Sequence, residues 1–321
     1  MTAWTDPAWR AEAERWIRGR AVELGRSLTG PIAQPHIQPW ATVMRAPTAD
    51  GDLWFKATLP VMAHEAGVVR VLAARRPDLV PPLLAGDPDR GWMLMDDAGE
   101  RLRAIVERER DLGRWEQILP LYGELQADAA ADAGRLAALG APARPLALLR
   151  GQYDSLLARA DWLADDERDR LRGLSPRVAE LCAQLAASGI PESIQHDDLH
   201  DGQVFVRDGR YLFMDWGDAC VSHPFFTMSV TLEGVLGWGL DDIEGSQDIT
   251  PFADAYLRPF ERYAGAAALR EALAVALRLG WICRALNTEM CISSYAIDPQ
   301  PAARDRAAVH LRMFADGLSP S

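Results

Sequence analysis

An acidic segment from Ile194 to Ala219 contains the side chains of this chain that are best suited to chemistry. Within it, Asp208-Gly209 separates two apolar runs, which is the strongest short signal for a β-hairpin. A tight hairpin places its two ends side by side, so we expect Asp198, Gln203 and Asp215 to converge at one rim. Two carboxylates and an amide oxygen are ligands that Mg²⁺ accepts, with positions left for phosphate oxygens.

The same residues resemble a known family. The order His196-x-Asp198, Gln203, hairpin, Asp215-Trp-Gly resembles the catalytic and metal loops of the protein-kinase-like fold. The full form, H-D-D-L-H-D-G-Q and then D-W-G-D-A, is similar to the small-molecule branch of that fold, the aminoglycoside phosphotransferase and choline kinase family. The resemblance implies that Asp198 orients or deprotonates the acceptor hydroxyl, that Asp215 is the main Mg²⁺ ligand, and that Gln203 replaces a metal-binding Asn.

Three positions of this loop depart from the common family form H-G-D-L-H-P-G-N. Gln203 keeps the amide oxygen but adds one methylene, as in the similar loops of the maltokinases and glucosamine kinases. Asp197 and Asp201 replace the Gly and the Pro. We expect His196 to support the loop by hydrogen bonding, and His200 to lie within reach of substrate or phosphate.

Lys56 is the only lysine of the chain. It lies in an alternating strand pattern at 52–58, and Glu65 follows at the start of a helical pattern. The resemblance implies a Lys–Glu ion pair in which Lys56 binds the α- and β-phosphates and Glu65 holds it in place. A surface lysine and a glutamate that complements a helix dipole are the alternative.

Two further strands are predicted at 80–85 and 91–95, followed by a polar exit. The resemblance makes that exit the hinge between two lobes, where backbone groups of Leu94, Met95 and Asp96 would pair with adenine. No G-x-G-x-x-G motif precedes Lys56, so the sequence leaves the residues that cover the phosphates unassigned.

Apolar residues recur at helical spacing through most of the chain after the hinge. We therefore predict an α+β, bilobal protein-kinase-like fold, with a strand-rich N-lobe at 1–95 and a mainly helical C-lobe at 96–321. The helices expected in the C-lobe are 102–110, 115–131, 146–157, 178–187, 231–240, 251–263 and 269–290.

The acceptor site is predicted only through the resemblance. In this family the helices after the D-x-G segment build the acceptor pocket, and aminoglycoside enzymes line it with acids. The candidates for binding amino groups are Asp241, Asp242, Glu244 and Glu289. A solvated acidic surface is the alternative. A pocket could also form around Trp238, Trp281, Arg284 and Asn287, although core packing accounts equally well for the tryptophans.

The amino-acid composition limits the classes of molecule that the protein is expected to bind. The chain has 321 residues, a net charge of −12 and 49% hydrophobic residues. This acidic balance opposes binding to nucleic acid or to anionic membranes, and it suits a cationic or sugar-like small molecule. No signal peptide or membrane span is recognisable, so a cytoplasmic protein is expected. The four cysteines lack metal-binding spacing and are expected to be reduced. Oligomeric state is not predicted.

We therefore predict a Mg²⁺-dependent kinase that transfers the γ-phosphate of ATP (or GTP) to a hydroxyl of an amino sugar or aminoglycoside. A catalytically weak pseudokinase that binds nucleotide or ligand is the main alternative. A zinc hydrolase is a third reading, because His196 and His200 mimic H-E-x-x-H. That motif requires a helix, and Pro191 together with the following strands argues against one.

Overall fold

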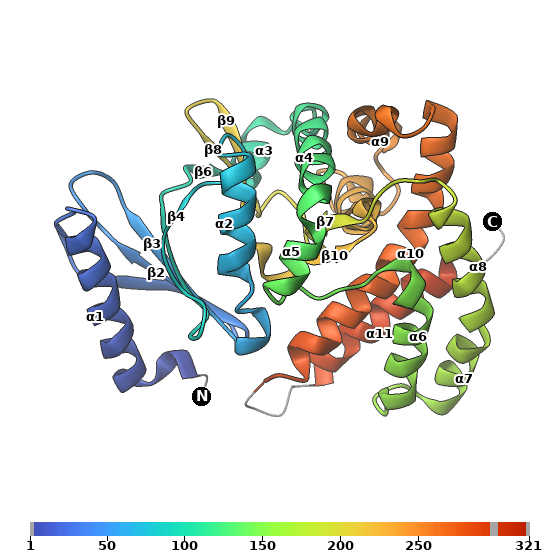
Figure 1. The fold of residues 1–321 in the computed structure, drawn as a ribbon, viewed down its shortest axis with the longest axis horizontal. Helices are drawn as coiled ribbons and strands as arrows, with labels where there is room; N and C mark the ends of the chain where they lie inside the picture. The colour runs from blue at the N-terminus through green and yellow to red at the C-terminus, as the bar shows by residue number, and fades with distance from the viewer. Residues whose placement is uncertain (1–2, 296–300, 319–321) are drawn as a thin grey trace.

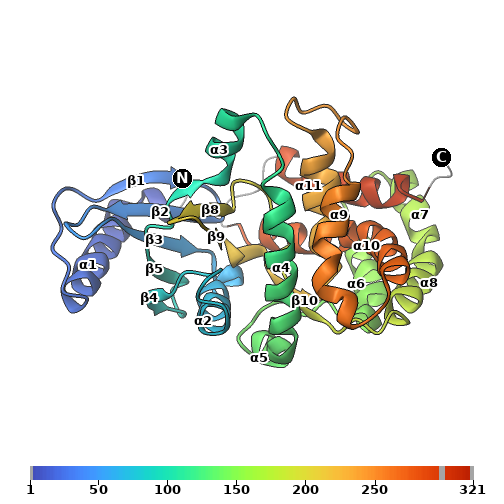
Figure 2. The same ribbon diagram turned by 90° about the horizontal axis from the view of Figure 1, so that it is seen from above.

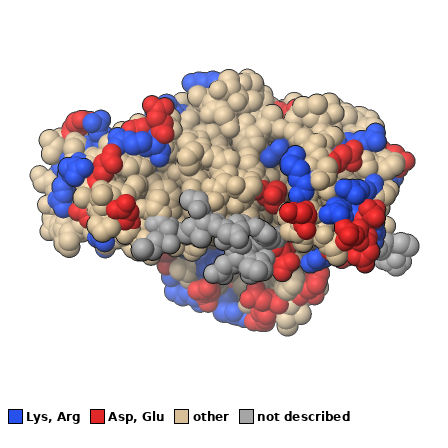
Figure 3. Space-filling model, turned by 90° about the horizontal axis from the view of Figure 1, so that it is seen from below, with Lys and Arg blue, Asp and Glu red and all other residues tan. Residues whose placement is uncertain are grey.

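The structure is a computed structural model that describes residues 3–295 and 301–318. It has the predicted α+β, bilobal form: a sheet-containing N-lobe lies beside a larger helical C-lobe (Figure 1). The structure describes no helix long and apolar enough to cross a membrane within those residues. On the face seen in Figure 3, basic and acidic side chains are interspersed at both ends of the molecule.

The N-lobe contains five strands in a single antiparallel sheet, among them the three predicted at 52–58, 80–85 and 91–95. Their order across the sheet is β1 (Ala33–Ile37), β2 (Ala41–Ala46), β3 (Leu53–Thr58), β5 (Trp92–Asp96) and β4 (Leu83–Asp87). Central β3 pairs with both β2 and β5. The strand that carries the lysine is therefore held on both edges.

Helices cover both faces of this sheet: α1 (Pro7–Glu23) lies on one side and α2 (Glu65–Arg75) on the other (Figure 1). Successive side chains of a strand point to opposite faces. Phe55 accordingly packs against Trp16 of α1, with ring centroids 5.6 Å apart. The next residue, Lys56, faces α2. The alternation in β3 thus directs the single lysine toward the C-lobe side of the sheet.

The hairpin predicted around Asp208-Gly209 is confirmed. It consists of β8 (Val204–Arg207) and β9 (Arg210–Phe213), and β6 (Glu100–Arg101) adds a third strand beside β8. Asp208 and Gly209 both have positive φ, 52° and 73°. Two successive positive φ values give the turn whose twist matches a two-residue hairpin.

The C-lobe is mainly helical, and the long α10 crosses it beside α6, α8, α9 and α11 (Figure 2). A short pair of strands, β7 (Ser193–Gln195) and β10 (Cys220–Ser222), flanks the acidic loop. The helices are α3 (Leu102–Glu109), α4 (Trp115–Ala129), α5 (Ala133–Ala138), α6 (Leu146–Arg159), α7 (Asp165–Gly173), α8 (Ser175–Ala186), α9 (Thr250–Leu257), α10 (Ala266–Ile292) and α11 (Pro301–Asp316).

In the C-lobe one predicted helix was wrong, and the helices α5 and α7 were not among those predicted. The segment expected as one helix at 231–240 is a π-helical turn, Ser229–Val235, followed by a 3₁₀ turn, Leu236–Trp238. The helix α11 was not predicted. It packs along α10, and its Phe314 is fully buried, with its ring centroid 5.8 Å from that of Tyr153.

Candidate active site

A cavity of about 470 Å³ lies between the sheet of the N-lobe and the β8–β9 hairpin. Its size falls within the range usual for small-molecule and nucleotide sites. Both lobes and the segment that joins them contribute to its walls. It is lined by Pro35, His36, Trp40, Ala41, Val43, Trp54, Phe55, Lys56, Glu65, Met95, Asp96, Asp97, Ala98, Gly99, Arg101, Gln203, Phe205, Met214 and Asp215.

Lys56 lies at the wall of this cavity between two carboxylates. Its Nζ is 2.7 Å from Oε1 of Glu65 on α2 and 2.5 Å from Oδ1 of Asp215 in the C-lobe. The ammonium and Glu65 are buried, while the side chain of Asp215 is 44% exposed to the cavity. One cation therefore joins β3, α2 and the exit of the hairpin.

Electrostatics in this cluster favour a charged lysine. Partial desolvation inside the cavity acts to raise the pKa of Asp215, but the adjacent Lys56 ammonium outweighs it and lowers that pKa to about 2. Burial raises the pKa of Glu65 to about 7, against the opposing effect of Lys56. The two carboxylates in turn raise the pKa of Lys56, against the effect of its burial. Near neutral pH, Asp215 is therefore ionised and Lys56 is protonated.

The backbone at Asp215 is held in an unusual conformation. Its φ of 62° lies in the left-handed region, which is uncommon for residues other than glycine. The buried indole of Trp216 donates to the carbonyl of Phe213 at 3.1 Å. His196 donates from Nε2 to the carbonyl of Met214 at 2.7 Å, and its ring packs against Trp216. His196 thus supports this loop through hydrogen bonding and packing.

The hairpin brings Gln203 beside the exit strand. The N–H of Met214 donates to the carbonyl of Gln203 at 2.9 Å, and both Gln203 and Asp215 line the cavity. The Asp215 carboxylate and the Gln203 amide oxygen, at this mouth of the cavity, are the kinds of oxygen ligand that Mg²⁺ prefers. The ion usually keeps phosphate and water oxygens as further ligands. Within residues 3–295 and 301–318, no three His, Cys, Asp or Glu side chains are grouped to hold a metal by themselves.

His200 is fixed beside Gln203. Its Nδ1 accepts from the N–H of Gly202 at 2.9 Å and lies 3.1 Å from Nη2 of Arg103. Two donors at Nδ1 leave the ring proton of the neutral imidazole on Nε2. That atom is 3.4 Å from the amide nitrogen Nε2 of Gln203, which is itself a donor, so neither atom accepts from the other in this tautomer. A Cβ at Gly202 would lie 2.6 Å from the His200 ring, so glycine is required for this approach.

Asp198 belongs to a second cluster, centred on Arg284 of α10. Nη2 of Arg284 donates to Oδ1 of Asp198 at 2.7 Å. Nη1 donates to Oδ2 of Asp218 at 3.0 Å and lies 3.3 Å from Oδ2 of Asp197. Burial raises the pKa of Asp198, and the Arg284 cation opposes that rise. The three carboxylates raise the pKa of Arg284 well above its ordinary value, against the effect of burial.

Only two of the three residues predicted to form the hinge line the cavity. Met95 and Asp96 line the cavity, whereas Leu94 is fully buried in the sheet between Phe55 and Ala85 and does not reach it. An inner strand uses its backbone groups in both ladders, which explains why Leu94 presents none to the cavity.

The segment predicted as the hinge continues through Asp97 and Ala98 to Gly99, and all three residues line the cavity. Gly99 has a φ of 92°, and a Cβ there would lie 2.2 Å from the carbonyl oxygen of Val206. Only glycine allows the hinge to approach β8 this closely. The polar exit predicted from the sequence is therefore fixed against the hairpin.

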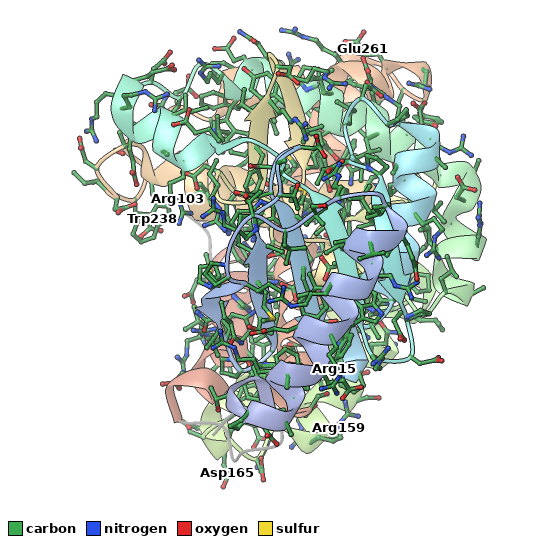
Figure 4. The ribbon with its side chains drawn as sticks, turned by 90° about the vertical axis from the view of Figure 1, so that its left-hand side faces the viewer. Arg15, Arg103, Arg159, Asp165, Trp238 and Glu261 are labelled. Atoms are coloured by element: carbon green, nitrogen blue, oxygen red, sulfur yellow. The ribbon has the colours of Figure 1, made fainter. Side chains whose placement is uncertain are left out.

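The predicted acidic acceptor residues do not line this cavity. Asp241 pairs with Arg110 at the end of α3, and Asp242 and Glu244 are exposed in the same loop. Figure 4 shows Arg103 of α3 and Trp238, just before this loop, on the same edge of the molecule. Glu289 is partly buried on α10, beyond Asn287.

Sequence reasoning missed Trp40, which lies in the turn between β1 and β2 and forms part of the cavity wall. Cζ of Arg306 on α11 is 5.7 Å from the centre of its ring, so the turn contacts the C-lobe. A large aromatic residue after Pro39, between two extended runs, was the available signal. For the contact of Arg284 with Asp198 the sequence carried no signal, because α10 is remote in the chain from the acidic loop.

Comparison with protein families finds that residues 43–272 match the sequence model described as "Phosphotransferase enzyme family". The matched region includes Lys56, Glu65, the acidic loop and the hairpin. It covers more than half of the chain.

Individual proteins give a consistent picture. A glucosamine kinase from Streptacidiphilus jiangxiensis is 28% identical over 160 residues, which are 48% of this chain and 36% of that protein. A choline/ethanolamine kinase family protein from Mesorhizobium loti has a similar structure, with a TM-score of 0.63, 17% identity and coverage of 96% of this chain and 95% of the other. The streptomycin–ATP–APH(2″)-IIa ternary complex has a TM-score of 0.57 at 13% identity and covers 95% of this chain and 98% of its own.

Proposed function

Because this chain belongs to the phosphotransferase enzyme family, whose members are small-molecule kinases, we propose that it transfers the γ-phosphate of Mg·ATP to a hydroxyl of an amino sugar or aminoglycoside. The placement of Lys56 between Glu65 and Asp215, at the wall of a cavity shared by both lobes, carries the proposal. A surface lysine would have neither the two carboxylate partners nor the burial.

The nucleotide would occupy the cavity between the lobes. We place the lobe boundary at residues 95 and 96, where the sheet ends and the hinge begins. Backbone groups of the hinge from Met95 to Gly99 would face the base. Lys56 would exchange its contact with Asp215 for the α- and β-phosphates, while Glu65 keeps the ammonium in place. The β1–β2 turn with Trp40 would cover the nucleotide in place of a glycine-rich loop.

Asp215 and Gln203 would hold Mg²⁺, which when bound neutralises the charge of the phosphates. Asp198 would align the acceptor hydroxyl with the γ-phosphate and receive its proton. His200 would donate from Nε2 to a phosphate oxygen or to the acceptor. Most of the rate enhancement would come from positioning, because phosphoryl transfer needs little covalent participation by the protein.

The acceptor class is supported by two observations. The glucosamine kinase from Streptacidiphilus jiangxiensis matches part of this chain, although the match spans only about a third of that protein. The segment from Asp197 to Asp215 contains five aspartates, of which Asp215 lines the cavity and Asp198 is partly exposed, and the whole chain has a net charge of −12. An ammonium group on the acceptor would be attracted to such a site.

A kinase screen with coupled detection of ADP tests the proposal. The purified protein would be assayed with Mg·ATP and Mg·GTP against amino sugars, aminoglycosides, neutral sugars and choline-like alcohols. Asp198→Asn is the matched control, because it keeps the shape of the side chain but removes its basic oxygen. We expect acceptor-dependent ADP release with an aminated sugar, reduced about 10²-fold to 10⁴-fold in the control.

A thermal-shift titration with Mg·ATP distinguishes a kinase from a protein that only binds nucleotide. Stabilisation by Mg·ATP without turnover on any acceptor would favour a nucleotide-binding module over an enzyme. Absence of both stabilisation and turnover would contradict the proposal. Equal activity in Asp198→Asn would contradict the role given to that carboxylate.

A further inference from the structure

Arg284, on α10, contacts three carboxylates at once. Its Nη2 donates to Oδ1 of Asp198 at 2.7 Å, while its Nη1 contacts Asp197 at 3.3 Å and Asp218 at 3.0 Å. Its side chain is only 16% exposed, so these charge-assisted bonds lie largely out of water. The planar guanidinium fixes the direction of each bond, which an ammonium would not do.

Asp197 forms the rigid base of this arrangement. Its φ is 67° and its carboxylate is fully buried. Gln195 donates to its Oδ1 at 3.1 Å, and Asn287 donates to its Oδ2 at 3.0 Å beside Arg284. Arg144 donates to the amide oxygen of Asn287 at 3.1 Å. The left-handed backbone and the saturated carboxylate therefore hold Asp197, and with it the start of the acidic loop, in one position.

The two oxygens of Asp198 differ as a result. Oδ1 is bonded to Arg284, whereas Oδ2 has no hydrogen-bond partner within residues 3–295 and 301–318. Nε2 of His200 lies 3.9 Å from Oδ2, beyond hydrogen-bonding distance. The side chain is 27% exposed. Oδ2 is therefore the oxygen that an incoming hydroxyl can reach.

The charges around Asp198 make Arg284 the main group that favours its ionised form. Burial raises the pKa of Asp198, Asp218 and Asp215 raise it further, and Arg284 and His200 oppose them. The charged or titratable groups that face it are Arg284 from α10, Asp218 and Asp215 from the segment after β9, and Asp197 and His200 from its own loop.

We propose that Arg284 is a positioning residue for phosphoryl transfer: it holds Oδ1 of Asp198 so that Oδ2 faces the acceptor hydroxyl as a carboxylate. The inference rests on the proposed function, because Asp198 meets an acceptor only if the protein is a kinase. It assigns the orientation of the acceptor-facing carboxylate to a helix distant in sequence from the acidic loop.

The test compares Arg284→Gln with the wild-type enzyme on the acceptor found in the screen. We expect kcat to fall by about 10²-fold, because an aligned group has been released. The KM for ATP should stay within about twofold, because the lysine cluster is untouched. The acid limb of the kcat/KM profile should move to higher pH, because the remaining carboxylates favour a protonated Asp198. Arg270→Gln is the control, since Arg270 lies on the same helix in an exposed ion pair with Asp254.

A second variant covers the case in which Arg284→Gln fails to fold. Arg284→Lys keeps the positive charge but loses the planar set of guanidinium N–H donors, so the variant should fold. The acid limb of its kcat/KM profile should stay near that of the wild type, while kcat should still fall by about tenfold. Wild-type kcat in Arg284→Lys, or wild-type kcat and pH profile in a folded Arg284→Gln, would overturn the inference. Absence of turnover in the wild-type enzyme would instead contradict the proposed function itself.

Discussion

Lys56 and Arg284 each lie among carboxylates, but the two clusters are built from different parts of the molecule. Lys56 is on β3 of the N-lobe, and one of its two partners, Asp215, is in the C-lobe. Arg284 and its three partners all belong to the C-lobe. The first cluster crosses the cleft between the lobes, whereas the second is confined to one side of it.

This difference separates an exchangeable contact from a permanent one. A compact ammonium can turn from a carboxylate to a phosphate, so the lysine cluster can open when nucleotide enters. The guanidinium cluster is held by several directed bonds inside one lobe, so it is preformed in the absence of ligand. Changes at the lysine cluster should therefore affect nucleotide binding, and changes at the arginine cluster should affect turnover.

The largest effect is expected from Asp215→Asn, because this residue is shared by the lysine cluster and the proposed metal site. Turnover should fall by at least about 10³-fold, because a metal ligand and the partner of Lys56 are lost together. The stabilisation by Mg·ATP in a thermal-shift assay should disappear. Retained stabilisation by Mg·ATP would show that Asp215 is not a metal ligand.

Replacing the lysine by arginine in one cluster, and the arginine by lysine in the other, tests this difference between the clusters directly. Lys56→Arg places a wider group in a buried site between carboxylates 2.7 and 2.5 Å away, so the KM for ATP should rise by about tenfold or more. Arg284→Lys should leave that KM within about twofold while kcat falls. Steady-state kinetics on the same acceptor would measure both. If both variants change the same constant, the division between the clusters is wrong.

A smaller effect is expected at Gln203. Gln203→Asn should keep the Mg²⁺ concentration for half-maximal activity within about threefold, because the amide oxygen remains. Gln203→Leu should raise it by about tenfold, because the oxygen is lost while the volume is similar. Magnesium titrations of both variants at saturating nucleotide would measure this. Equal behaviour of the two would assign Gln203 to packing rather than to the metal.

The smallest effect concerns stability and pH. Glu65 has a pKa of about 7 in the folded protein against 4.5 in the unfolded chain. Between these values the folded state holds the proton more tightly, so this residue makes the free energy of unfolding fall as pH rises from 4.5 to 7. Chemical denaturation of Glu65→Gln across this window should lack that downward contribution. An unchanged slope in the variant would argue against the raised pKa.

Local sequence determined the elements that carry the site. Asp208-Gly209 between apolar runs was sufficient for the β8–β9 hairpin, because two successive positive φ values suit that dipeptide. Alternation in β3 and the helical pattern from Glu65 predicted the strand and the helix that carry these two residues, and the family resemblance implied their pairing. The types and order of the loop residues also indicated the fold, because they match a family pattern over a short stretch.

Long-range packing decided the rest. No local pattern relates Arg284 to Asp198, and their contact exists only because α10 crosses the C-lobe behind the acidic loop. The π-helical turn at Ser229–Val235 and the buried face of α11 likewise depend on neighbours remote in the chain. Residue types and short spacings are properties of the sequence. Which carboxylate a distant cation holds, and which oxygen it leaves free, is a property of the packed structure.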